Sequence, residues 1–179
     1  NPDLVLFPHW HWIVDEAIFS KFTCVVFHTS PLPYGRGGSP IQNLIKRGHS
    51  SAPVCALAMT EGIDDGPIYA REYISLDGRL SDILDRLNQA VNKLIERIVE
   101  DLPQPEEQTG EAVIFRRLES GDNQIDPRVT LDQIYDEIRM VDDDSYPSAY
   151  LMLQNIRIEF SEKEKSADGL NCKVQKKTN

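Results

Sequence analysis

Short strand-like runs alternate with longer apolar stripes of helical spacing along the first 102 residues. Apolar runs rich in β-branched residues predict strands at 4–7, 23–27, 53–59 and 67–76. Apolar residues spaced three and four apart predict helices at 14–22, 40–47 and 80–102, and the last is one continuous stripe. Strands separated by helices predict an α/β domain with a mainly parallel sheet.

The pattern changes after residue 102. Segment 103–111 is rich in Pro, Gln and Glu and predicts a linker. Beyond it we expect a small α+β extension at 112–160: a strand at 112–118, a helix at 130–140 capped by Thr130, and a hairpin turning at Gln154 and Asn155. The polar segment 161–179 predicts a flexible tail. The α/β domain is therefore expected at 1–102.

One stretch, 23–40, carries the strongest candidate chemistry. Its strand ends at His28, a loop rich in Gly and Pro follows, and Pro40 opens a helix. Open α/β sheets bind ligands at strand ends. If the sheet is parallel, the turn that contains Asp64 lies near His28, and a carboxylate beside an imidazole orients the ring. From spacing alone, a structural histidine and an ordinary Asp-Gly turn are equally consistent with the pattern.

Charge narrows the class of partner. The chain has a net charge of −10, and residues 100–145 alone contain 14 acidic and 4 basic side chains. Nucleic-acid binders usually present a basic patch, and the only basic segment here is a short lysine-containing tail, so nucleic acid is not the expected partner. No apolar run approaches the length that spans a membrane. Three widely spaced cysteines, Cys24, Cys55 and Cys172, predict reduced thiols in a cytoplasmic protein.

A second constellation combines His9 and His11 with His28 and Asp64 as metal ligands, as in an amidohydrolase-type site. That class needs a complete β/α barrel, for which this chain is too short. We therefore expect no metal, and interpret the alternating Trp and His residues as the wall of a pocket.

The stretch at 28–40 resembles the signature of the folate-dependent formyltransferases, which reads His-x-Ser-Leu-Leu-Pro, two variable residues, Arg-Gly, two small residues and Pro. The positions in register are His28, Ser30, Leu32, Pro33, Arg36, Gly37 and Pro40. A second family motif matches Ile63-Asp64-Asp65-Gly66 at a suitable separation. The resemblance is to methionyl-tRNA formyltransferase-like proteins and covers residues 4–102. It implies a partial Rossmann-like formyltransferase domain that lacks the family's first βαβ segment.

The resemblance also implies a reaction and a set of roles. N10-formyltetrahydrofolate would be the co-substrate, without a metal; His28 would polarise the formyl carbonyl, and Asp64 would orient His28 and help to deprotonate the amine. The implied pterin-binding residues are Trp10, Trp12, Met59, Glu61, Gly62, Ile63 and Gly66. The implied substrate-binding residues are Ser30, Pro33, Arg36 and Gly37. Val26 stands where the family usually has Asn, an additional oxyanion donor.

The C-terminal part is similar to the short extension of formyltransferases that act on nucleotide-linked amino sugars. In that interpretation Arg116, Arg117 and Arg139 meet a diphosphate, although ion pairs with nearby acids are the more common role. The expected acceptor is thus an amino sugar on a nucleotide. The alternatives are methionyl-tRNA, water in a deformylase, and a folate- or nucleotide-binding relative without catalysis. The sequence leaves the oligomeric state open.

Overall fold

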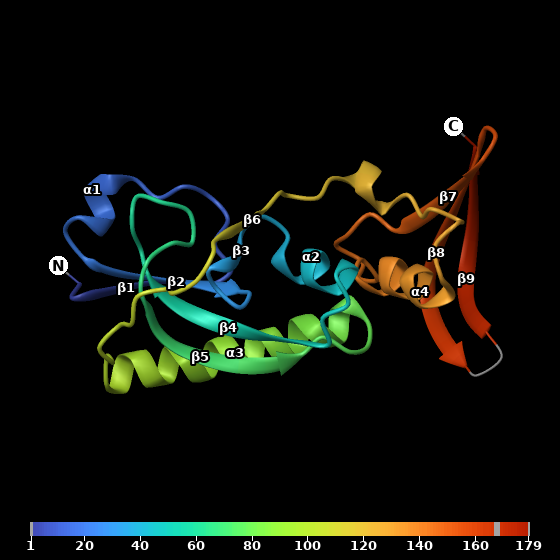
Figure 1. Ribbon diagram of the computed structural model, residues 1–179. Helices are drawn as coiled ribbons and strands as arrows, with labels where there is room; N and C mark the ends of the chain where they lie inside the picture. The colour runs from blue at the N-terminus through green and yellow to red at the C-terminus, as the bar shows by residue number, and fades with distance from the viewer. Residues whose placement is uncertain (1, 167–168, 179) are drawn as a thin grey trace.

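A four-stranded sheet frames the N-terminal part of the computed structural model, which describes residues 2–166 and 169–178 (Figure 1). Its strands lie in the spatial order β1-β2-β4-β5. Their bounds are Leu4–Phe7 for β1, Thr23–Thr29 for β2, Ser51–Ala58 for β4 and Ile68–Ser75 for β5. All four were expected from the sequence, which confirms the α/β class.

Strand direction differs from the expectation of a mainly parallel sheet. β1 and β2 are parallel, as is the separate pair of β3 (Tyr34–Gly37) and β6 (Val113–Phe115), whereas β4 is antiparallel to both β2 and β5. For β4 and β5 the physical reason lies in their connection. β5 follows β4 after a turn at 59–67 with no crossover helix, and a parallel neighbour would require a crossover.

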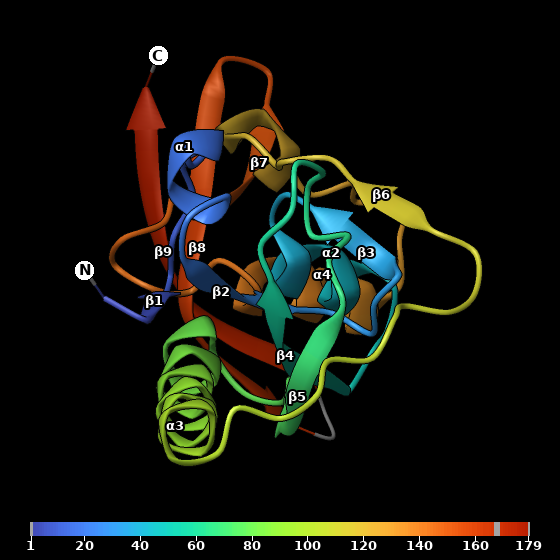
Figure 2. The same cartoon turned by 90° about the vertical axis from the view of Figure 1, so that its left-hand side faces the viewer.

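The sheet buries both faces, and alternate residues of β4 show this. Ala52, Val54 and Ala56 belong to the main core, which includes the buried stripe of helix α3 (Leu80–Glu100). Cys55 and Leu57 belong to a smaller cluster with Leu32 and Ile68. In Figure 2, α3 lies along one side of the sheet and β3 and β6 lie on the other.

The two short helices flank the strand that carries the candidate histidine. Helix α1 spans only Glu16–Phe19, shorter than the expected 14–22. It begins at Glu16 because the Asp15 carboxylate caps it by accepting from the Ala17 N–H at 2.8 Å. Helix α2 (Pro40–Lys46) begins at Pro40 as expected. Its buried apolar residues, Ile41, Leu44 and Ile45, join the main core.

The C-terminal part contains a short 3₁₀ turn, η1 (Ser120–Asn123), helix α4 (Leu131–Arg139) and a three-stranded antiparallel sheet. Thr130 caps α4 as expected, because its hydroxyl accepts from the Gln133 N–H. The predicted hairpin is also present: β7 (Ala149–Leu153) pairs with β8 (Ile156–Ser166), and Gln154 has a φ of 57° in the turn.

The expectation of a flexible tail at 161–179 is wrong for the residues described there. β8 continues to Ser166, and β9 (Gly169–Thr178) pairs with it along its length. Lys173 and Lys177 pair with Glu162 and Glu159 of β8, at 2.9 and 2.6 Å. The polar composition that suggested disorder instead supplies charge pairs across neighbouring strands. Residues 167, 168 and 179 lie outside the described ranges.

None of the helices within the described ranges is long and apolar enough to cross a membrane.

The stripe on α3 gives a direct test of the core. Ile98 is 1% exposed and its neighbour Val99 is 63% exposed. We expect Ile98→Ala to lower the free energy of unfolding by about 2–5 kcal/mol, because it leaves a cavity against the sheet. Val99→Ala should change it by less than about 0.5 kcal/mol. Urea unfolding followed by circular dichroism measures both, and equal losses would contradict this packing.

Candidate functional site

The end of β2 buries His28 on the sheet face opposite α3, with 7% of the residue exposed. Its Nδ1 lies 3.2 Å from Asp64 Oδ2, and its Nε2 lies 2.7 Å from the carbonyl oxygen of Gly35. A carbonyl oxygen can only accept, so Nε2 carries the proton of that hydrogen bond. The other contact faces a carboxyl group. The Asp64 carboxyl group thus faces the ring nitrogen on the other side from the one that donates to Gly35.

Asp64 reaches His28 by a route that the sequence did not predict. β4 runs antiparallel to β2 and ends where Ala58 pairs with Val25, several residues before His28. The turn at 59–67 must therefore fold back toward the end of β2. Asp64 adopts a φ of 52° in this turn, and its Oδ2 also accepts from the Gly37 N–H at 2.9 Å. The expected juxtaposition of the two side chains is present, for a different topological reason.

Two glycines let the backbone of β3 approach closely enough to form hydrogen bonds with His28 and Asp64. Gly35 has a φ of +90°, and a Cβ there would lie 2.7 Å from the Phe115 ring and 2.9 Å from Ser30 Cβ. Gly37 has a φ of +100°, and a Cβ there would lie 2.5 Å from the Phe115 carbonyl oxygen. Only glycine satisfies both conditions. The Gly35 carbonyl thus reaches His28, and the Gly37 N–H reaches Asp64.

Gln108, in the segment expected to be a mere linker, joins the two loops of the site. Its Oε1 accepts from Arg36 Nε and Nη2 at 3.0 and 2.8 Å. Its Nε2 donates to the carbonyl oxygens of Asp64 and Gly66, both at 2.8 Å. Sequence reasoning missed this residue. Arg36, expected to bind substrate, directs its guanidinium group to another part of the protein.

The remaining residues of the two motifs form the inner frame of the loops. Ser30 is fully buried, and its Oγ has no hydrogen-bond partner among the described residues. Pro33 is buried, and its carbonyl oxygen accepts from the Val113 N–H at 3.2 Å. Gly66 is also buried, and a Cβ there would lie 1.9 Å from the Ala58 carbonyl oxygen.

Some of the expected pterin-binding residues lie apart from His28. The Met59 N–H donates to the Cys24 carbonyl oxygen at 2.9 Å, at the opposite end of β2. Trp10 and Trp12 are largely exposed, and their rings pack edge to face with centroids 5.1 Å apart. The described ring contacts of the two tryptophans extend to Phe7 and His11. None of these contacts connects them with His28 and Asp64.

The expected pterin-binding residues Glu61, Gly62 and Ile63 lie at the tip of the turn after β4. Ile63 is 67% exposed there. Beside it is an open hollow of about 650 Å³, lined by Thr60, Glu61, Gly62, Asp65, Pro67 and Glu107. The hollow is polar and mainly acidic. It contains two of the expected pterin-binding residues, Glu61 and Gly62.

Apolar side chains surround the histidine on its own sheet face. Val26 shares this face and packs against the small cluster of Leu32, Cys55, Leu57 and Ile68. The Cys55 thiol donates to the Ser30 carbonyl oxygen at 3.5 Å, and burial raises the pKa of this thiol to about 11. Cys55 is thus a neutral thiol in the frame of the site.

Within the described ranges, no group of three or more His, Cys, Asp and Glu side chains is arranged to hold a metal ion.

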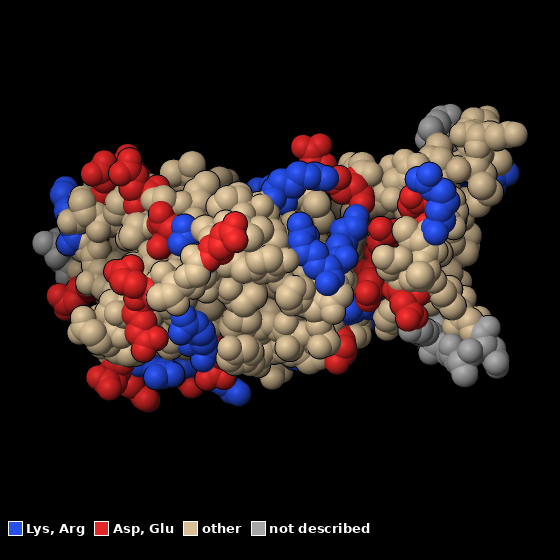
Figure 3. Space-filling view, in the orientation of Figure 1, with Lys and Arg blue, Asp and Glu red and all other residues tan. Residues whose placement is uncertain are grey.

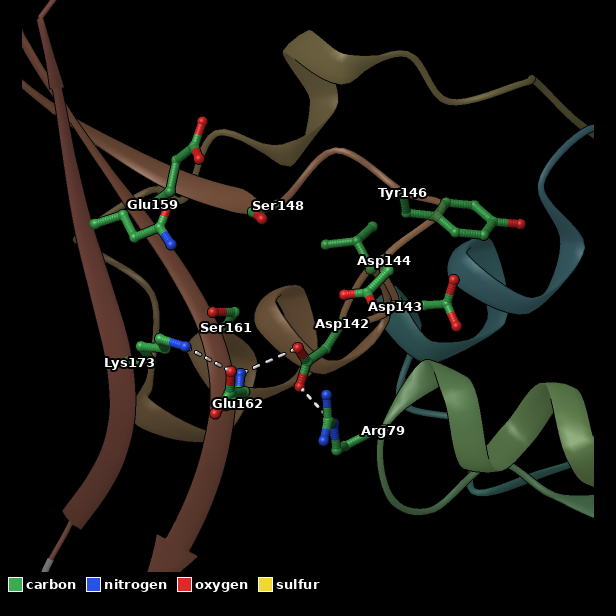
Figure 4. A pocket seen from close by; sticks show the side chains of 12 residues that line it. Arg79, Asp142, Asp143, Asp144, Tyr146, Ser148, Glu159, Ser161, Glu162 and Lys173 are labelled. Carbon is green, nitrogen blue, oxygen red and sulfur yellow. Dashed lines mark hydrogen bonds and ion pairs between the residues drawn. The ribbon is translucent and has the colours of Figure 1, made fainter.

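A second cavity, of about 290 Å³, lies between the start of α3 and the C-terminal sheet (Figure 4). Asp142 accepts from Arg79 Nε at 3.0 Å and from the Glu162 N–H at 3.1 Å, and Glu162 pairs with Lys173. The labelled side chains of Figure 4 include none of the expected site residues. These contacts connect the N-terminal part with the C-terminal sheet.

Comparison with protein families matches both parts of the chain. Residues 1–100 match the family described as "Formyl transferase", and residues 120–177 match "Methionyl-tRNA formyltransferase, C-terminal domain". A methionyl-tRNA formyltransferase of Gluconobacter oxydans is 29% identical over 161 residues, which is 87% of this chain and 52% of that protein. The chain spans about half the length of the curated relatives it matches.

Solved structures support the same assignment. The methionyl-tRNA formyltransferase from Clostridium thermocellum superposes with a TM-score of 0.95 at 39% identity, covering 100% of this chain and 79% of that one. A sugar N-formyltransferase from Shewanella has a TM-score of 0.71 at 19% identity, covering 85% of this chain and 65% of that one. The second likeness concerns the fold alone.

Gly35 provides a test of the site's packing, with Gly48 as a matched control. Both have positive φ, but a Cβ at Gly48 meets nothing within 4 Å. We expect Gly48→Ala to cost about 1–2 kcal/mol of unfolding free energy from backbone strain. Gly35→Ala should cost about 1–3 kcal/mol more because it also clashes with Phe115 and Ser30. Chemical denaturation compares the two, and equal losses would show that β3 moves away freely.

Proposed function

Because this chain belongs to the formyltransferase family, we propose that it transfers a formyl group from N10-formyltetrahydrofolate to a primary amine. The observation that carries the proposal is the contact between His28 Nδ1 and Asp64 Oδ2 at 3.2 Å. These two residues come from separate motifs of the family resemblance, and the fold brings the turn that carries Asp64 against the end of β2 that carries His28. An oriented imidazole beside a carboxylate suits acid-base chemistry.

The proposed reaction is acyl transfer without a covalent enzyme intermediate. The amine nitrogen attacks the formyl carbon, and the resulting oxyanion accepts a hydrogen bond from a ring N–H of His28. Asp64, through its contact with His28, takes up the proton that the attacking nitrogen loses. The bond from carbon to N10 then breaks, and the proton held by Asp64 passes to N10 to give tetrahydrofolate. The new bond is an amide, and nothing is oxidised or reduced.

The hydrogen bonds of His28 set a condition on this reaction. Its Nε2–H already donates to the Gly35 carbonyl oxygen. A formyl oxygen that accepts from this nitrogen must therefore take the place of the Gly35 carbonyl. We propose that β3 or the His28 ring shifts when the donor binds.

For the donor, we propose that the turn after β4 forms one wall of the pterin site. Support comes from the open hollow at Glu61 and Gly62 and from the exposed Ile63 beside it. Trp10 and Trp12 supply exposed aromatic surface on which a flat ring system can stack. The apolar packing of Val26 leaves its position without a side-chain donor for the oxyanion. We propose that the main polar contribution there comes from His28.

For the acceptor we retain two candidates. Methionyl-tRNA is favoured by the family match over residues 120–177 and by the names of the relatives. A nucleotide-linked amino sugar is favoured by charge, because residues 100–145 are strongly acidic and repel a polyanion. Figure 3 shows one small group of basic side chains over α2 with acidic groups beside it.

Two of the three arginines expected to meet a diphosphate form ion pairs within the protein. Arg116 pairs with Asp122, and this pairing lowers the pKa of the Asp122 carboxyl group well below its usual range. Arg139 is buried, with its Nε 2.6 Å from Asp136 Oδ1. Ion pairing is therefore the role that the structure gives both residues. Arg117 is exposed, so an amino-sugar diphosphate would depend on this residue.

The test is formyl transfer by the intact protein with four acceptors: an amino-sugar nucleotide, methionyl-tRNA, methionine and water. We expect tetrahydrofolate release with one amine acceptor and a fall of about 10²–10³-fold in His28→Ala. Asp64→Asn keeps the side-chain shape and should lower kcat by about 10²–10⁴-fold. Asp85→Asn, on the exposed side of α3, is the matched control and should leave kcat unchanged.

Other outcomes would replace the proposal. Release with water alone would identify a deformylase. Bound folate without release to any acceptor would identify a binding relative that has lost catalysis. Full activity in Asp64→Asn would remove the pair from the mechanism.

A further inference from the structure

We propose that Gln108 is a positioning residue that holds Asp64 against His28, an inference that rests on the proposed function. All the hydrogen-bonding capacity of its side-chain amide is used. Two N–H groups go to the backbone carbonyls of Asp64 and Gly66, and the oxygen accepts twice from Arg36. A side chain placed only to fill space would not need four polar partners.

The orientation of this amide is determined by chemistry. Its two partners on the turn are carbonyl oxygens, which can only accept, and its partner on β3 is a guanidinium group, which can only donate. Rotating the amide by half a turn would oppose like groups on both sides. Gln108 therefore needs both a donor for the turn carbonyls and an acceptor for Arg36. A side chain with only donors or only acceptors cannot make both sets of hydrogen bonds.

The turn needs such support because of its path. It leaves β4 at Ala58, beside Val25, and returns toward His28 with Asp64 in the left-handed region. The conformation of Asp64 costs free energy for a residue with a side chain. The turn's own bonds, from the Ala58 N–H to the Pro67 carbonyl and between Thr60 and Asp65, close its base. The bonds from Gln108 act directly on the residues at 64 and 66.

The segment that carries Gln108 is bonded to β5 on one side of the site and to β3 on the other. Glu106 and Ile68 exchange two backbone hydrogen bonds, at 2.7 and 2.9 Å, next to the turn. β6 then pairs with β3, which supplies the Gly35 carbonyl to His28 and the Gly37 N–H to Asp64. Residues 106–115 thus run from one loop of the site to the other. Gln108 connects the two loops by its side chain.

Three variants separate the possible roles. Gln108→Met keeps the approximate size of the side chain and removes all four hydrogen bonds. Gln108→Glu keeps an acceptor for Arg36 and places oxygen against the carbonyls of Asp64 and Gly66. Arg36→Met leaves the amide free to hold the turn. Gln104→Met, at an exposed position of the same segment, is the matched control.

The kinetic readout is the separation of kcat from KM. We expect Gln108→Met and Gln108→Glu to lower kcat by about 10–100-fold, because a small misplacement of an acid-base pair is costly. The KM of the donor should change less than about twofold. Arg36→Met should lower kcat less than either Gln108 variant, because the bonds from Gln108 to the turn remain. If Arg36 instead binds substrate, its variant would raise the KM of the acceptor.

The second readout needs no turnover. We expect a His28 ring proton that faces Asp64 Oδ2 to give a proton NMR resonance outside the amide region, assigned by its loss in His28→Ala. We expect this resonance to disappear or shift in both Gln108 variants and to persist in Gln104→Met. Loss of the resonance in an enzyme with no detectable transfer would leave the positioning role intact and remove only the proposed function.

The proposal is overturned if both Gln108 variants keep the resonance and a kcat within twofold of Gln104→Met. A fall in thermal stability with unchanged kcat in the folded protein would also overturn it, because that is the signature of a purely structural residue. If Gln108→Met does not fold, Gln108→Glu carries the test, since it retains the contacts with Arg36.

Discussion

The contact between a buried imidazole and a carboxylate from a distant turn is the constraint on which the site depends. The backbone of His28 is fixed by its strand, since it pairs with Cys55 within the sheet. Asp64 is not fixed in this way, because the turn that carries it returns over the sheet from the far end of β4. The groups around the pair hold Asp64 in place instead. The glycines of β3 approach from one side, and the amide of Gln108 holds the backbone from the other.

The two faces of the sheet differ in how much apolar surface they bury. One face packs on α3 as part of the main core, which also includes buried side chains of α2 and Phe115 of β6 and provides most of the apolar burial. The opposite face has only a small apolar cluster, and the polar groups of His28 and Asp64 lie there. A thick core on one side allows the other side to hold polar groups and glycines that contribute little to stability. This arrangement is common where a rigid sheet presents functional loops.

Local pattern was sufficient for the elements and for the two motifs, and insufficient for whatever depends on distant contacts. Strand and helix positions followed from apolar spacing, and Thr130 and Pro40 marked helix starts correctly. The direction of β4 was missed because spacing does not specify pairing. Gln108 was missed because its partners are 42 to 72 residues away and its neighbours have the composition of a linker. β9 was missed because charged strands that pair with each other have the same composition as a disordered tail.

The hydrogen bond from His28 Nε2 to the Gly35 carbonyl has an energetic consequence for the proposed reaction. A formyl oxygen that displaces Gly35 exchanges one neutral carbonyl acceptor for another, so binding the donor gains little from His28. The oxyanion that then forms is charged, and hydrogen bonds to a charged acceptor are roughly twice as strong as neutral ones. Because the Gly35 carbonyl must be displaced, His28 adds little to the binding of the donor in the ground state. Its hydrogen bond stabilises mainly the charged transition state. In the proposed reaction the transition state is thus bound more tightly than the substrate, because the Gly35 carbonyl competes with the formyl oxygen for the same His28 N–H.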